Sequence, residues 1–71
     1  MRVIYDTHTD TLTIILRDEP IADSDEQTAG VIFDYDAAGN VVAMELLDAS
    51  QRIAQPNQMI YELVGGQLAP A

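Results

Sequence analysis

Apolar and polar residues alternate along much of this 71-residue chain, in short runs with the two-residue period of a β-strand. The first run alternates Val3 and Tyr5 with Arg2, Ile4 and Asp6. Four further runs occupy residues 11–17, 21–27, 31–35 and 41–47. Clusters rich in Asp, Gly, Asn or Pro separate the runs, and such residues favour turns. The pattern predicts about five short strands.

One part of this pattern occurs twice, at an offset of 30 residues. Tyr5-Asp6 recurs as Tyr35-Asp36, and three residues separate each pair from the next run. Self-similarity at a fixed offset usually marks one supersecondary unit that is used twice. Each copy predicts an antiparallel β-hairpin with one apolar face. The core is predicted to contain Val3, Tyr5, Leu12, Ile14, Leu16, Val31, Phe33, Val42, Met44 and Leu46.

After the second hairpin the pattern is less regular. A short helical turn is predicted near residues 49–54, which Asp48 or Ser50 could cap. Residues 59–64 fit a strand or one face of a helix, and their content of Ile, Tyr and Val favours the strand.

The expected fold class is therefore α+β, mainly β, with two pseudo-repeated antiparallel hairpins and one short helical turn. We expect a single β-rich domain over residues 1–66. The last residues, 67–71, are expected to form a frayed C-terminal tail.

Size makes self-association the expected source of extra stability. Domains this small often need a disulfide, a metal or a second copy. The chain has no cysteine and one histidine, which excludes a disulfide and leaves too few ligands for the usual zinc sites. The face opposite the predicted core is also apolar, and its residues are Ile4, Ile15, Ile32, Val41 and Leu47. A homo-oligomer is therefore expected, as a dimer or a larger assembly.

The charge balance limits the possible partners. The formal net charge is −9, from 12 acidic and 3 basic residues. Nucleic acids and anionic membranes are recognised mainly through Lys and Arg, so neither is an expected partner. A basic protein is the expected one. No apolar run approaches the length of a membrane span, and the charged N-terminus is unlike a signal peptide, so a cytoplasmic location is expected.

The predicted contact with such a partner is a set of acidic residues: Asp23, Asp25, Glu26, Asp34 and Asp36. The alternative is that the acidic run 23–26 is a solvated edge that prevents open-ended sheet pairing. Glu45 shares a face with apolar residues, and we expect it to form an ion pair with Arg2, Arg17 or Arg52.

His8 is the one side chain with an ordinary pKa near neutral. Asp6 and Asp10 are close in sequence and could orient a general base, or could contribute oxygen ligands for Ca²⁺ together with Asp34 and Asp36. An exposed turn histidine and turn-capping carboxylates explain the same residues. We therefore assign no catalytic residue, no cofactor and no metal ligand.

The ordered set of motifs resembles the bacterial family known as domain of unknown function 2283. The resemblance covers residues 1 to about 53 and is carried by Tyr5-Asp6, Asp10, Leu12, Ile14, Leu16, the run 30–36, the run 39–42 and the run 45–50. Thr7-His8 departs from the family, where a Pro-acid pair is common, as do Thr13 and Ala43. The resemblance implies a compact β-rich fold and no established activity. Some relatives resemble the acidic half of toxin–antitoxin pairs.

Three hypotheses for function follow. The first is a non-catalytic interaction domain, in its most concrete form an antitoxin-like neutraliser of a basic protein. The second is a small metal-dependent or acid/base enzyme around His8 and the Asp-rich loops. The third is a structural module without a fixed ligand.

Overall fold

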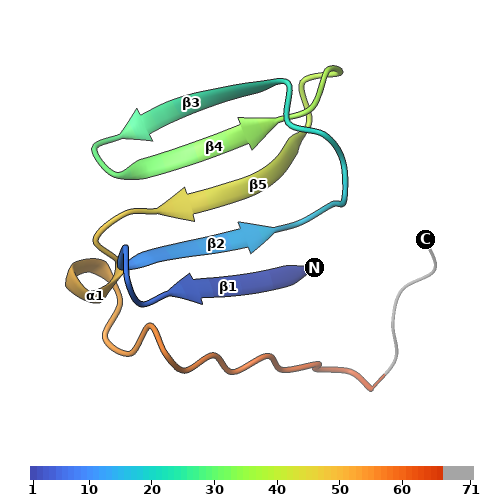
Figure 1. The fold of residues 1–71 in the computed structure, drawn as a ribbon. Helices are drawn as coiled ribbons and strands as arrows, with labels where there is room; N and C mark the ends of the chain where they lie inside the picture. The colour runs from blue at the N-terminus through green and yellow to red at the C-terminus, as the bar shows by residue number, and fades with distance from the viewer. Residues whose placement is uncertain (67–71) are drawn as a thin grey trace.

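The computed structural model describes residues 1–66 as one five-stranded antiparallel sheet followed by a helical turn (Figure 1). The strands are β1 (Arg2–Asp6), β2 (Thr11–Ile15), β3 (Asp23–Thr28), β4 (Val31–Tyr35) and β5 (Val41–Leu46), and the turn is α1 (Ala49–Arg52). The order across the sheet is β1-β2-β5-β4-β3. The predicted fold class is confirmed, whereas the predicted frayed tail at 67–71 lies outside the described residues.

The 30-residue repeat is present in the registers of the two hairpins, β1–β2 and β4–β5. Val3 lies opposite Ile14 in the first hairpin, and Phe33 lies opposite Met44 in the second. The equivalence holds until a register shift after Asp34. Such a bulge bends a strand and increases its twist locally, so the hairpins correspond in pairing and differ near the second loop.

The two hairpins meet through β2 and β5, where Ile14 lies opposite Met44. These two residues are equivalent in the repeat, so an approximate twofold axis passes between them, perpendicular to the sheet. β3 breaks this symmetry because it adds to the outer edge of β4. The outer edge of β1 has no corresponding strand among the described residues.

Residues directly opposite each other on antiparallel strands share a face of the sheet. The back face, turned away from the viewer in Figure 1, contains Val3, Tyr5, Leu12, Ile14, Val31, Phe33, Met44 and Leu46. The front face contains Ile4, Thr13, Ile15, Ile32, Asp34, Ala43 and Glu45. The back face is thus the predicted core face.

Burial of the predicted core is only partial. Leu12 and Val42 are buried, and Val42 is 1% exposed. Leu16 is 39% exposed, so its placement in the core was wrong. It follows the last residue of β2, and its amide donates a hydrogen bond to the Val42 carbonyl at 2.8 Å while the chain leaves the sheet. The other predicted core residues are half-buried.

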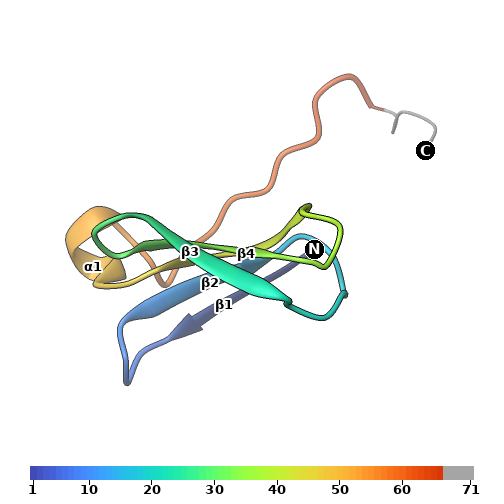
Figure 2. The same ribbon diagram turned by 90° about the horizontal axis from the view of Figure 1, so that it is seen from above.

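The chain after α1 covers part of the back face. It passes behind the sheet, and its later part runs away from the strands (Figures 1 and 2). Ile53, Pro56 and Met59 line an apolar groove there together with Leu12 and Ile14. A single sheet with this partial cover leaves both faces accessible.

The favoured strand over residues 59–64 was wrong for this structure. These residues form neither a strand nor a helix. Their apolar alternation is as expected, but strand structure needs a hydrogen-bonded neighbour, and β1 does not pair with them.

Candidate functional site

Asp10 joins the first hairpin loop to α1. Its carboxylate accepts hydrogen bonds from the Tyr5 hydroxyl at 2.6 Å, from the Ser50 amide at 3.0 Å and from the Ser50 hydroxyl at 2.6 Å. Its carbonyl accepts one from the Ala49 amide at 2.8 Å. The side chain therefore satisfies an amide at the start of α1 that has no partner within the helix.

This arrangement corrects the predicted cap of α1. Asp48 precedes the helix but has a left-handed backbone, with φ 52°, and its side chain makes no capping bond. Ser50 donates to the cap instead of supplying it. The true capping group comes from 40 residues earlier in the chain, so no local pattern could reveal it.

The same contacts determine the protonation of Asp10 and Tyr5. The Ser50 hydroxyl, and then the Tyr5 hydroxyl, hold the pKa of Asp10 below its usual value. The bond to Asp10 raises the pKa of Tyr5. A general base works best with a pKa near the operating pH, so Asp10 is a poor base at neutral pH. The hydrogen bonds among Tyr5, Asp10 and Ser50 therefore have a structural role, because they connect the first hairpin to α1.

The remaining loop carboxylates also bind backbone amides. Asp6 accepts from the His8 amide at 2.9 Å, and its repeat equivalent Asp36 accepts from the Ala38 amide at 3.0 Å. The amide of Asn40 makes a further bond to Asp36, and this bond is the main cause that lowers the pKa of Asp36. These are the turn-capping roles that were the alternative to ion binding.

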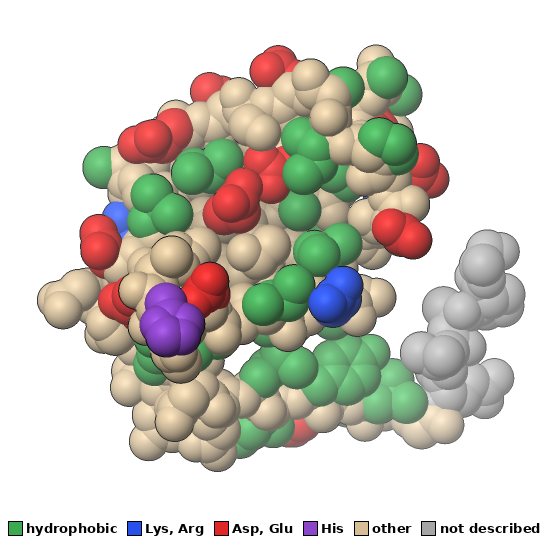
Figure 3. All heavy atoms as spheres, in the orientation of Figure 1, with side chains coloured by type: hydrophobic (Ala, Val, Ile, Leu, Met, Phe, Trp, Pro, Cys, Tyr) green, Lys and Arg blue, Asp and Glu red, His purple; other side chains and the backbone are tan. Residues whose placement is uncertain are grey.

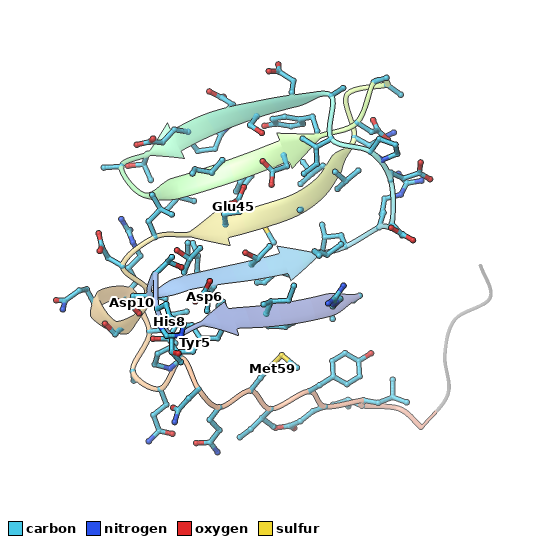
Figure 4. All side chains as sticks on the ribbon, viewed as in Figure 1. Tyr5, Asp6, His8, Asp10, Glu45 and Met59 are labelled. Atoms are coloured by element: carbon cyan, nitrogen blue, oxygen red, sulfur yellow. The ribbon has the colours of Figure 1, made fainter. Side chains whose placement is uncertain are left out.

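His8 is exposed at the loop between β1 and β2 (Figure 4). Its hydrogen bond to Asp6 comes from the backbone amide, so this contact does not orient the imidazole. Within residues 1–66, no group of three or more His, Cys, Asp or Glu side chains is arranged to hold a metal ion. The enzyme hypothesis gains no support from this part of the chain.

Two carboxylic acids, Asp34 and Glu45, lie together at the centre of the front face. Asp34 is 2% exposed and accepts a hydrogen bond from the Ser24 hydroxyl at 2.6 Å. Asp34 lies opposite Ala43 and Glu45 lies opposite Ile32, which makes the two acids diagonal neighbours on β4 and β5. We call them the acid pair.

The position of Glu45 beside Asp34 raises the pKa of Glu45. Hydrogen bonding to Asp34 is the main cause that raises the pKa of Glu45, followed by burial and by the repulsion between the two charges. A negative charge beside a carboxyl group disfavours its ionised form. A positive charge beside the acid pair would favour the ionised form of Glu45.

The expected ion pair of Glu45 with an arginine is not what the structure shows, because the group that shifts its pKa is the Asp34 carboxyl. Arg52 donates instead to the carbonyl oxygens of Leu47, at 2.8 Å, and of Ala29. The charge of Arg17 acts on Asp36. The acid pair is thus left without a described cationic partner.

Apolar side chains surround the acid pair on the front face. Ile32 precedes Asp34 by two residues on β4, Ile4 and Ile15 lie on β1 and β2, and Leu47 follows β5. Ile4 is 37% exposed and Leu47 is 36% exposed. Figure 3 shows acidic side chains among hydrophobic ones in the middle of this face.

The structure divides the predicted contact set. Asp23 and Asp25 lie opposite Tyr35 and Phe33, so they belong to the back side of β3. Glu26 lies opposite Ile32 on the front side, near Asp34. The carboxylate of Asp36 caps its own loop. Glu45, which the prediction omitted, lies beside Asp34 on the front face.

Comparison with known proteins gives one match. A family model described as "Protein of unknown function (DUF2283)" matches residues 2–50, which include all five strands. No curated protein and no solved structure matches the chain. In the described part of the chain, no helix is long and apolar enough to cross a membrane.

Proposed function

The chain belongs to the DUF2283 family of proteins of unknown function, and from that premise we propose that it is a non-catalytic interaction protein whose front face binds a basic protein partner. The acid pair of Asp34 and Glu45 is the observation that carries the proposal. The proposed contact with the partner is therefore Asp34 and Glu45 at the centre of the front face, and no longer the acidic run 23–26 on β3.

An arginine or lysine of a partner would complete the acid pair. Hydrogen bonding to Asp34, partial burial and the Asp34 charge raise the pKa of Glu45. A guanidinium group supplies several donors in a planar fork that matches two carboxylate oxygens. Its positive charge would offset the repulsion between the two carboxylates.

The apolar surroundings would strengthen this contact. Interface hot spots lie in desolvated centres whose neighbours exclude water. Ile4, Ile15, Ile32 and Leu47 provide such a border around the acid pair. A complementary partner would therefore present a basic residue among apolar ones.

The remaining charge would act at longer range. A net charge of −9 attracts a basic partner and speeds encounter, although it adds less to final affinity. Asp23, Asp25 and Glu26 on the outer strand would contribute to this steering. In its most concrete form the proposal is an antitoxin-like neutraliser of a basic protein in the cytoplasm.

A defined peptide tests the proposal without knowledge of the natural partner. The probe is a soluble 12-residue peptide in which Arg alternates with Leu, and the control peptide has Glu in place of Arg. Binding is followed by ¹⁵N NMR at low salt. We expect shifts centred on Ile15, Ile32 and Glu45 with the basic peptide alone.

Two matched variants locate the contact. Glu45→Gln should weaken binding by about tenfold, because a charge-assisted hydrogen bond is lost. Asp25→Asn removes the same charge from the back side of β3 and should weaken binding by less than about twofold at 0.15 M salt. Equal losses in the two variants would show that net charge alone attracts the peptide and would contradict the proposal.

A further inference from the structure

We propose that residues 59–64 of one copy, the C-terminal segment, pair with the free edge of β1 in a second copy of this chain. The exchange is reciprocal and adds a sixth strand to each sheet. The inference concerns the edge and back of the sheet, so it does not depend on the function proposed for the front face.

The C-terminal segment has the composition of a strand but no strand neighbour. Five of its six side chains are large and apolar, and their exposed fractions are Met59 61%, Ile60 72%, Tyr61 67%, Leu63 53% and Val64 88%. Branched and aromatic residues favour β-structure when they can pack against a neighbour. The segment runs extended past the sheet (Figures 1 and 2) and leaves these side chains uncovered.

The two edges of the sheet differ in how they are protected. β3, at one edge, has the sequence DSDEQT, is exposed throughout and contains a register shift near Glu26. Charges and bulges of this kind prevent edge pairing. β1, at the other edge, has the sequence RVIYD with an apolar centre. The edge of β1 therefore retains the features of a site for strand addition.

The approximate twofold symmetry of the sheet also indicates a place for an additional strand at the outer edge of β1. β4 has β3 as its outer neighbour, and β1 is the equivalent of β4 in the first hairpin. A sixth strand beside β1 would restore the symmetry. β3 has six residues, as does the C-terminal segment.

An antiparallel register matches the two partners chemically. It pairs Val3 with Tyr61, Ile4 with Ile60, Tyr5 with Met59, and Arg2 with Glu62. The apolar pairs of Val3 and Tyr5 continue the back face, and Arg2 faces an opposite charge. A slip by one residue would turn the segment's apolar set to the other face and separate the charges.

The segment does not fill this position in its own chain. An open groove of about 420 Å³ lies between it and β1, lined by Met1, Val3, Met59 and Tyr61. The five large apolar side chains of the segment are each more than half exposed, and a second copy could bury them.

Sedimentation of proline variants tests the pairing. Ile60→Pro combined with Tyr61→Pro removes both amide donors, one of which must face β1 in any register. Neither amide is used by the sheet of the single chain. We expect wild-type protein to sediment as a dimer and the double variant as a monomer, with the dissociation constant raised by about 100-fold or more. The control Ile60→Val should remain dimeric.

Single cysteines distinguish exchange from other arrangements, since the natural chain contains none. Val3→Cys and Tyr61→Cys copies are mixed and oxidised; opposing residues on paired strands lie within disulfide range. A cross-linked dimer that forms in the mixture, and not from either variant alone, supports the proposal. Cross-linking of Val3→Cys with itself would show pairing of two β1 edges and would overturn it.

Two further outcomes would also overturn it. One is a monomeric wild-type protein at 100 µM, a concentration about 100-fold above a micromolar dissociation constant. The other is an internal disulfide in a Val3→Cys, Tyr61→Cys double variant that stays monomeric. Salt separates this inference from the proposed function: screening should strengthen association of two copies that each carry −9, and should weaken binding of a basic partner.

Discussion

The hydroxyl and amide of Ser50 both donate hydrogen bonds to the carboxylate of Asp10, at 2.6 Å and 3.0 Å, across 40 residues of chain. This contact attaches α1 to the loop of the first hairpin. Ala49, the first residue of α1, is fully buried beside it. The helical turn is too short to be stable alone, so its presence depends on this attachment.

Replacing Asp10 by Asn should destabilise the protein and release α1. Asn tolerates the left-handed backbone at this position, where φ is 51°, so the change tests the carboxylate rather than the turn. We expect a lower urea midpoint at pH 7 and loss of the protected amide of Ser50 in hydrogen exchange. Asp18→Asn, which removes an exposed carboxylate after β2, should change neither.

The sign of the pH dependence follows from the lowered pKa of Asp10. A depressed pKa in the folded state contributes stability above the unfolded value, 3.8, and this stability is lost as pH falls through the folded value. Wild-type protein should therefore lose more stability than Asp10→Asn between pH 5 and acid pH. Parallel losses would show that the carboxylate does not cap α1.

Glu45→Gln should stabilise the isolated protein at neutral pH. A raised pKa means that the folded state prefers the protonated acid, so its stabilising effect is complete below the unfolded value of 4.5 and is lost as pH rises through the folded value. The uncharged amide should raise the urea midpoint at pH 7 and make little difference below pH 4.5. A lower midpoint at pH 7 would contradict the account of the acid pair.

Gly30→Ala should cost more than Gly39→Ala. Both glycines have positive φ, 78° and 87°, so each alanine carries a backbone cost of about 1–2 kcal/mol. Only at Gly30 would the added methyl group meet a side chain, the guanidinium of Arg52, which holds the carbonyl of Ala29. Denaturation of both variants in an Arg52→Ala background measures the difference, which should disappear there.

His8→Ala should leave folding unchanged. His8 is exposed, and its contact with Asp6 uses the backbone amide, which alanine retains. We expect the same urea midpoint and the same affinity for the Arg-containing peptide. Loss of any measurable activity in this variant, with its fold intact, would favour the enzyme hypothesis instead.

The strands could be predicted from the sequence because their signal is local. Alternation is recognised from adjacent residues alone. The recurrence of Tyr5-Asp6 as Tyr35-Asp36 showed where in the sequence each hairpin lies. Leu16 was misplaced because the alternation continues one residue beyond Ile15, the last residue of β2, to a side chain that is exposed. Periodicity identifies a face but does not show what covers it.

The acid pair could have been found in part. Glu45 interrupts an apolar face, and that anomaly was visible in the sequence. The residue beside Glu45 could not be identified without the register of β4 against β5, which makes Asp34 its diagonal neighbour. The link from Asp10 to Ser50 had no local signal, because it depends on where the end of the sheet brings two distant segments together.

The central claim is that Asp34 raises the pKa of Glu45 and that the positive charge of a basic partner lowers it again. The most direct measurement is the NMR titration of the Glu45 side-chain carboxyl carbon, alone and with the Arg-containing peptide. The account predicts a pKa above the ordinary value of 4.5 in the free protein, because of Asp34, and a clear fall when the peptide binds. An ordinary pKa that the peptide does not change would contradict it.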